Sequence, residues 1–237
     1  MSEEIKNKEK ERGKYIKKIT VSILFHFIIL IVILLIAGNT SYWQGWLFVI
    51  YLIIVFVIQL ILFTNNTSLL KEREKPGPGV KKWDKLLQSI YIPTYCILII
   101  TATLDTGRFQ WTTGQFTYYL YIIGYFLLIA SSVIVTRAMM VNKFYSRLVR
   151  IQSDRNHHVI KDGPYRYIRH PGNFSGIILT TGSSLALGSI YGLIPAFFII
   201  CMLIIRTYLE DKTLKKELTG YQEYSNYVKY RLIPGIW

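Results

Sequence analysis

Polar side chains suited to chemistry occur at three places in the last third of the chain. They are Arg166/Arg169/His170, Arg206/Glu210/Asp211, and a row of tyrosines followed by Arg231. Together they offer cations, carboxylates and aromatic faces, which suit a ligand that carries both charges and rings. Arg and Tyr at a membrane surface often only anchor helices, so each residue taken alone indicates little.

The first two groups flank a long apolar run. Residues 174–205 contain no Lys, Arg, Asp or Glu over 32 positions, and Gly188-Ser189 interrupts the run near its middle, followed by Gly192 and Pro195. One straight helix of that length would overshoot the hydrocarbon. The break therefore predicts a hairpin of two short helices, with one tilted helix as the alternative. A hairpin would bring His170 and Glu210 to the same membrane face.

Four further apolar blocks precede this run. Each has 18 to 21 residues without a charge, namely 19–37, 43–63, 86–104 and 118–135. A helix needs roughly 20 residues to cross a bilayer. The sequence thus predicts an all-α integral membrane protein with five to six transmembrane helices. It divides into a charged cytoplasmic tail (1–18), four transmembrane helices with their loops (19–135) and a C-terminal region that contains the candidate site (136–237).

The Lys and Arg residues that give the chain its net charge of +14 lie between the apolar blocks. Of the 28 Lys and Arg residues, 27 fall on alternate sides of the apolar blocks if the chain crosses six times. This is the positive-inside pattern and places both termini in the cytoplasm. A basic cytoplasmic face is attracted to anionic headgroups, so we expect membrane lipids as partners and no nucleic acid. The two cysteines lie inside apolar blocks, and no metal-binding spacing occurs.

The region from Thr136 to Asn173 is too long for a simple connector. Its 38 residues interleave polar and apolar side chains and close with two prolines and a glycine between Asp162 and Pro171. Long loops in compact proteins are often functional, and we expect this one to be an ordered strap at a binding edge. Beyond the apolar run, the spacing of Leu214, Leu218 and Tyr221 predicts one face of a helix that continues into the cytoplasm. The apolar C-terminus is expected to dock.

Several short motifs then follow one another in a recognisable order. They are Gly-Pro-Tyr-x-x-x-Arg-His-Pro at 163–171, the acid pair at 210–211, Gly-Tyr-x-x-Tyr at 220–224 and Arg-Leu-Ile-Pro at 231–234. This set resembles the isoprenylcysteine carboxyl methyltransferase family, including its bacterial and archaeal members, which is related to the membrane phospholipid methyltransferases. The resemblance is strongest from Thr136 to the end, and Lys-Lys-Trp-Asp at 81–84 also fits. Asn173 stands where the family usually has Tyr, and Asp211 where Glu is commoner.

The resemblance implies that residues 136–237 form a methyltransferase region with S-adenosylmethionine as cofactor, bound at the membrane surface without a nucleotide-binding sheet. A lipophilic membrane substrate would enter from the side. The residues it implies for the cofactor are Tyr165, Arg169, His170, Pro171, Asn173, Glu210, Asp211, Tyr221 and Tyr224. Arg206 and Glu210 are the expected catalytic pair. Arg206 would bind a substrate carboxylate through two hydrogen bonds and orient one oxygen.

The methyl acceptor is open at this stage. The family name implies the carboxylate of a C-terminal isoprenylcysteine, while a phospholipid amine or another isoprenoid carboxylate or thiol is also compatible. A membrane reductase of the sterol-reductase kind, using NADPH, has a similar arrangement of C-terminal Tyr, Arg and Pro residues. A non-catalytic membrane scaffold is the third reading, and it leaves the clustered polar edge unexplained. The sequence does not predict the oligomeric state.

Overall fold

The structure is a computed structural model that describes residues 3–63, 69, 72–73 and 77–237, with side chains from Ile19 onward. It is all-helical, and no strand occurs in these ranges. The helices are α1 (Glu3–Ala37), α2 (Trp43–Phe63), α4 (Lys82–Thr103), α5 (Thr117–Val141), α6 (Pro171–Ala186), α7 (Leu193–Glu217) and the short α8 (Tyr221–Tyr227), and a π-helical turn, η1 (Leu104–Phe109), extends α4. The backbone of residues 3–18 continues α1, while the side chains of this predicted tail lie outside the described part.

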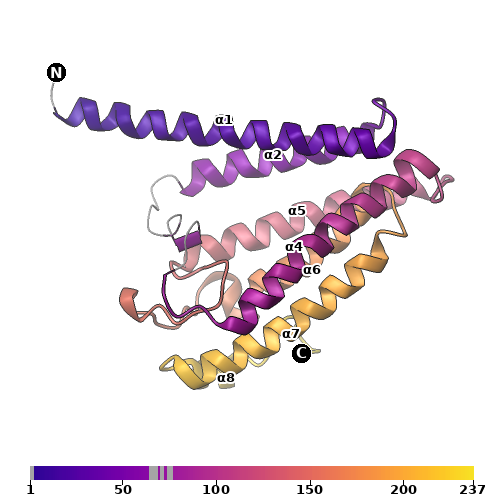
Figure 1. The fold of residues 1–237 in the computed structure, drawn as a ribbon. Coiled ribbons are helices and arrows are strands. Elements are labelled where there is room, and N and C mark those ends of the chain that lie inside the picture. Colours follow the sequence, from indigo (N-terminus) through magenta and orange to yellow (C-terminus); the bar gives the residue numbers. More distant parts are fainter. Residues whose placement is uncertain (1–2, 64–68, 70–71, 74–76) are drawn as a thin grey trace.

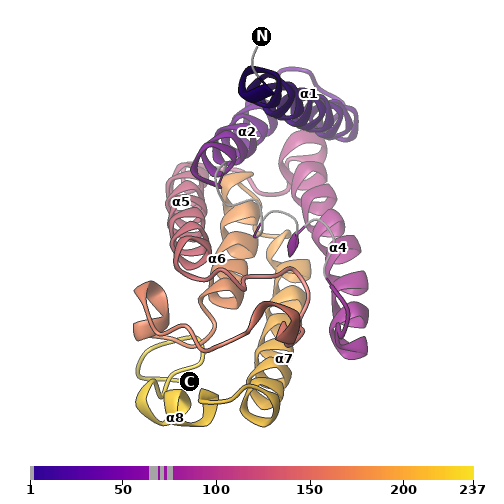
Figure 2. The same cartoon turned by 90° about the vertical axis from the view of Figure 1, so that its left-hand side faces the viewer.

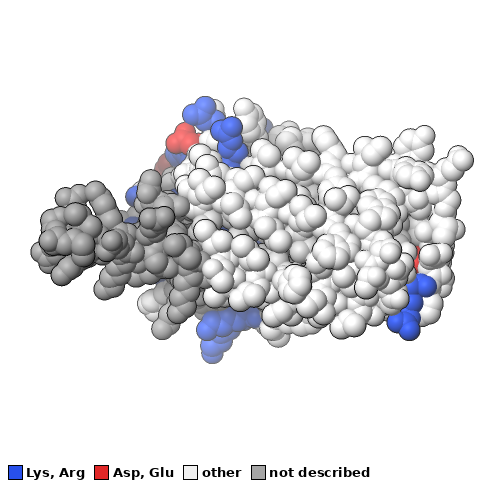
Figure 3. Space-filling view, turned by 90° about the horizontal axis from the view of Figure 1, so that it is seen from above, with Lys and Arg blue, Asp and Glu red and all other residues white. Residues whose placement is uncertain are grey.

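Five of the helices are long and apolar enough to cross a membrane: α1, α2, α4 with η1, α5 and α7. Their outer surfaces carry large exposed apolar side chains such as Leu35, Ile61 and Phe126. Figure 3 shows a wide band without charged side chains between two ends that carry them. Such a band is what lipid tails require of a protein surface, and the predicted integral membrane fold is confirmed.

The predicted hairpin is present, since α6 and α7 run antiparallel and pack on each other (Figure 1). Only α6 is short as expected, because α7 continues past the apolar run to Glu217 and has 25 residues. The turn between them begins earlier than the expected break, because α6 ends at Ala186. Gly188 adopts φ +81°, a left-handed conformation that favours glycine. With 16 residues, α6 is about 24 Å long, short of the roughly 30 Å hydrocarbon core. It is therefore a short buried helix beside five full-length ones.

Small residues let α6 approach α5 closely. A Cβ placed on Gly124 would overlap the backbone of Ala186, so the two helices touch there through their main chains. Further along, the hydroxyls of Ser131 and Ser175 are 3.0 Å apart. Interfaces built from Gly and Ser are typical of helices packed in membranes, where close contact replaces the hydrophobic effect as the driving force.

The strap is ordered, and it crosses the end of the bundle next to α8 (Figure 2). It contains two 3-10 turns, η2 (Ser153–Arg155) and η3 (Gly163–Arg166). The buried guanidinium of Arg150 fixes it to the segment before α4, with Nη2 2.8 Å from Glu72 Oε2. Two predicted helix ends differ from the structure: α4 begins at Lys82 rather than Leu86, and α5 extends to Val141 rather than Val135.

The C-terminal end departs from the single predicted helix. The helix stops at Glu217, and Gly220 adopts φ +80° before α8 begins, so Leu214 and Tyr221 belong to different helices. They nevertheless pack in the same apolar cluster. The C-terminal segment docks as expected, because the carbonyl oxygens of Tyr230 and Arg231 accept hydrogen bonds from the backbone N–H groups of Arg169 and His170.

Candidate active site

A pocket opens between the strap, the start of α6, the end of α7 and α8. It encloses about 830 Å³, counting the part that is open to solvent. Every site residue predicted from the sequence except Asp211 lines it, and they are Tyr165, Arg169, His170, Pro171, Asn173, Arg206, Glu210, Tyr221 and Tyr224. Strap residues, among them Phe144, Gln152 and His157, form much of the remaining wall.

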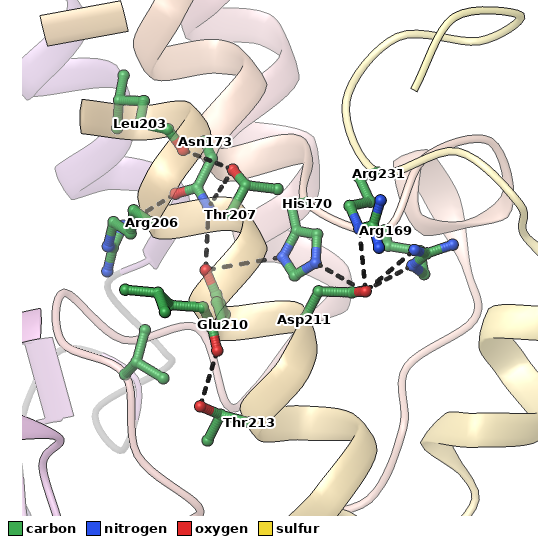
Figure 4. Close-up of polar contacts among 12 residues, drawn as sticks. Arg169, His170, Asn173, Leu203, Arg206, Thr207, Glu210, Asp211, Thr213 and Arg231 are labelled. Carbon is green, nitrogen blue, oxygen red and sulfur yellow. Dashed lines mark hydrogen bonds and ion pairs between the residues drawn. The ribbon is translucent and has the colours of Figure 1, made fainter. Parts of the chain in front are cut away.

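His170 and Glu210 meet at the pocket wall, as the hairpin argument predicted. Nδ1 of His170 lies 3.6 Å from Oε2 of Glu210. The same carboxylate oxygen accepts a hydrogen bond of 2.9 Å from Nδ2 of Asn173 (Figure 4). Asn173 also accepts a hydrogen bond of 2.9 Å from Nη1 of Arg206. Asn173 thus connects the two expected catalytic side chains.

The helical repeat of α7 decides which of its residues face the pocket. Arg206, Glu210 and Leu214 are four residues apart and therefore lie on one face, one turn above another. All three line the pocket. Because the apolar part of α7 precedes Arg206, this arginine is the nearest of the three to the membrane. The pocket therefore runs from a charged end beside the membrane to an apolar end at Leu214 and Leu218.

Asp211 lies behind the pocket wall and joins several buried groups. It is 2% exposed, and its oxygens accept hydrogen bonds from Nε of Arg169 at 2.8 Å, Nε of Arg231 at 3.0 Å and the hydroxyl of Tyr221 at 3.0 Å. Nε2 of His170 is 3.3 Å away. Asp211 therefore orients His170 and fixes the C-terminal segment, whereas Glu210 faces the pocket.

Two neighbouring acids set the charge of His170. Burial alone would lower the pKa of this imidazole, but its hydrogen bonds with Asp211 and Glu210 outweigh burial and raise the pKa above the ordinary value. Burial, together with the carboxylates of Asp211 and Glu210, raises the pKa of Tyr221, so its hydroxyl stays protonated and donates to Asp211. The pocket wall thus presents an imidazole between two acids, which favour its protonated form.

The guanidinium of Arg206 binds a carboxylate of the protein itself, whereas the sequence led us to expect it to be available for a substrate carboxylate. Its Nε lies 2.7 Å from Oδ1 of Asp84 and its Nη2 lies 3.3 Å from Oδ2, so the two-pronged face of the guanidinium is already occupied. Nη2 also donates to the carbonyl of Arg147. One N–H of Nη1 has no acceptor among the described residues. Contrary to that expectation, Arg206 therefore cannot bind a substrate carboxylate through two hydrogen bonds in this structure. It can donate one hydrogen bond, from Nη1.

Sequence reasoning gave no role to the strap side chains that line the pocket. The ring centroids of Phe144 and His157 are 4.4 Å apart, and Nδ1 of His157 accepts a hydrogen bond from the backbone N–H of Gln152. Burial, with nearby cationic groups adding to it, lowers the pKa of His157 to about 4. This histidine is neutral at physiological pH. The only sequence signal was the mixture of polar and apolar residues that predicted an ordered segment.

Comparison with known proteins gives a family match over the part of the chain that contains most of the pocket residues. The chain has no significant match among curated protein sequences. Residues 119–219 match the model of the phospholipid methyltransferase family, and this stretch runs from α5 through α7 and includes the strap, the hairpin and the acid pair. The match favours a membrane methyltransferase, and therefore an enzyme rather than a scaffold. Over this stretch the chain is thus similar to the phospholipid methyltransferases, membrane enzymes that act on lipid-related substrates.

Proposed function

We propose that the protein transfers a methyl group from S-adenosylmethionine to a lipophilic acceptor in the membrane, and that the pocket at His170 and Glu210 binds the cofactor. The observation that carries this proposal is the meeting of His170, Glu210 and Asn173 in one pocket at the end of the membrane spans. The family match over the same residues supports it.

The pocket residues fit the chemical groups of this cofactor. Glu210 can accept hydrogen bonds from an amine or from a ribose diol. His170, with the positive end of α6 that begins at Pro171, suits a carboxylate. The apolar end at Leu214 and Leu218 suits the face of an adenine. Bound there, S-adenosylmethionine would supply an electrophilic methyl group on its sulfonium.

The acceptor would approach from the membrane end of the pocket, where Arg206 lies one turn before Glu210. We propose a carboxylate acceptor of the isoprenylcysteine kind. An ionised carboxylate is already nucleophilic, so it needs positioning and desolvation rather than a base. Arg206 offers its remaining Nη1 hydrogen to one oxygen, which leaves the other oxygen free to attack.

A phospholipid amine is the second candidate acceptor, favoured by the description of the matched family. A protonated amine must lose a proton before it can attack a methyl group. Glu210, the nearest carboxylate, already pairs with His170 and accepts from Asn173. We therefore rank the amine behind the carboxylate.

The site is proposed to face the cytoplasm. The basic segments before α4, in the strap and after α7 support this orientation through the positive-inside rule. The N-terminal end of α1 lies at the same end of the bundle as α8 and the strap (Figure 1). Both termini would then be cytoplasmic.

Purified protein in lipid nanodiscs, given S-adenosylmethionine with a labelled methyl group, tests the proposal. One set receives a prenylated cysteine with a free carboxylate, and another receives phosphatidylethanolamine. We expect the labelled methyl group on the prenylcysteine. Treatment with base should release this label, because base hydrolyses a methyl ester. Base-stable label on phosphatidylethanolamine would favour the amine, and binding of NADPH without methyl transfer to either acceptor would contradict the proposal.

A further inference from the structure

Asp84, at the start of α4, is a fully buried carboxylate outside the pocket lining, with a relative exposure of 0%. Its Oδ1 accepts from Nε of Arg206 at 2.7 Å. Its Oδ2 accepts from the backbone N–H of Val149 at 2.6 Å and from Nη2 of Arg206 at 3.3 Å. One acid thus joins three segments: α4, the strap and α7.

This arrangement fixes the guanidinium plane. A free arginine side chain samples many rotamers, and two parallel hydrogen bonds to a carboxylate restrict it to one orientation. Asp84 occupies Nε and Nη2 on one side of Arg206, so Nη1 points the other way, to Oδ1 of Asn173 in the pocket lining. A buried carboxylate is costly unless it is paired, so this pair is not replaced by water without loss.

We infer that Asp84 is a positioning residue for the methyl-transfer site, because it directs the free Nη1 hydrogen of Arg206 toward the acceptor and ties the strap to the same anchor through Val149. The inference rests on the proposed function. It assigns Asp84 no contact with the cofactor or the acceptor. Its effect on catalysis must therefore pass through Arg206.

A purely structural role makes a different prediction. If Asp84 only stabilises the end of α4, its removal lowers catalysis by the same factor whether or not Arg206 is present. If it acts through Arg206, its removal has little further effect once Arg206 is gone. A double-mutant cycle separates the two cases.

The cycle uses Asp84→Asn, Arg206→Gln and the double variant, measured in nanodiscs with the acceptor that the wild type methylates. Glu217→Gln is the matched control. It removes an exposed ion pair of 2.6 Å with Lys81, which also links the segment before α4 to α7 but does not touch Arg206. Each variant is measured for kcat, for KM of the acceptor and for Kd of S-adenosylmethionine.

Asp84→Asn is expected to lower kcat by about 10- to 100-fold, because a small misplacement of a positioning group is costly. The Kd of the cofactor should stay within about 3-fold, since Glu210 and His170 are untouched. In the Arg206→Gln background, Asp84→Asn should change kcat by less than about 3-fold. Glu217→Gln should change it by less than about 2-fold.

Equal factors in the two backgrounds, or wild-type kcat in Asp84→Asn, would overturn the inference while leaving the proposed function standing. A wild type that methylates no acceptor would overturn both. If Asp84→Asn does not fold, Asp84→Glu takes its place in the same cycle, since it keeps the charge but displaces the carboxylate by one methylene. A lowered kcat with unchanged cofactor Kd, absent in the Arg206→Gln background, would then support the inference.

Discussion

The imidazole of His170 and the carboxylate of Glu210 lie 3.6 Å apart between Nδ1 and Oε2, although 40 positions separate them in the chain. They meet because α6 and α7 form a hairpin, so that the start of α6 and the end of α7 both lie at the pocket. The geometry of the site therefore depends on how α6 packs, including at its far end, where it is nearest to α5.

Gly124→Ala tests that packing. The new methyl group would overlap the backbone of Ala186, and backbone cannot move aside as a side chain can. We expect a destabilisation of at least about 1–3 kcal/mol, the usual cost of overpacking, seen as a lower midpoint of thermal unfolding in nanodiscs. Gly176→Ala is the control, because its Cβ meets only the flexible end of Leu203, at 3.1 Å. Equal unfolding midpoints for the two variants would contradict the close α5–α6 contact.

Asp211→Asn should lower the free energy of unfolding strongly. It removes the buried charge that Arg169 and Arg231 share, and breaking such a group costs about 3–5 kcal/mol. The C-terminal segment should also become sensitive to protease, because Arg231 loses its anchor. Asp162→Asn, which disrupts an exposed pair with Arg166, should change the unfolding midpoint little. A stable Asp211→Asn with a protected C-terminus would refute this role.

Stability should depend on pH with opposite signs at two histidines. The pKa of His170 is raised, so its contribution is fully present below pH 6.5 and is lost as pH rises through the higher folded-state pKa. The pKa of His157 is lowered to about 4, so its contribution is present above pH 6.5 and is lost as pH falls toward 4. Unfolding midpoints of wild type, His170→Gln and His157→Gln between pH 4 and 9 measure both.

The midpoint difference between wild type and His170→Gln should shrink at high pH, and the difference for His157→Gln should shrink at low pH. The two variants act as controls for each other, because general effects of pH on the protein cancel in each difference. Two differences that change in the same direction would show that at least one of these pKa shifts has the wrong sign.

Much of the fold was predictable because membrane spans obey simple rules of length and charge. The apolar blocks located α1, α2, α4, α5 and the hairpin, and Gly188 marked its turn to within a few residues. The ends of α4 and α5 were missed because both helices continue into polar sequence, where apolar content no longer marks a boundary. The break after Glu217 was missed because Leu214, Leu218 and Tyr221 keep helical spacing across a glycine that in fact ends the helix.

The site residues that flank the hairpin could be predicted from sequence motifs. The site residues elsewhere in the chain could not. His170 and Glu210 border the same apolar run, so topology alone brings them together. Asp84 lies 122 positions before Arg206 and on a different helix, and nothing in the local sequence shows that its carboxylate turns inward to bind that arginine. The roles of Asp211 and Glu210 were likewise inseparable as neighbours in sequence, because only the helix rotation shows which of them faces the pocket.

Binding of S-adenosylmethionine to wild type and to Glu210→Gln tests the central claim most directly. Wild type should bind the cofactor and not NADPH, and Glu210→Gln should bind it about 10- to 100-fold more weakly, the loss expected for a hydrogen bond to a charged acceptor. Glu223→Gln, an exposed change on α8, should bind as wild type does. Wild-type affinity in Glu210→Gln, or a wild type that does not bind S-adenosylmethionine, would contradict the account.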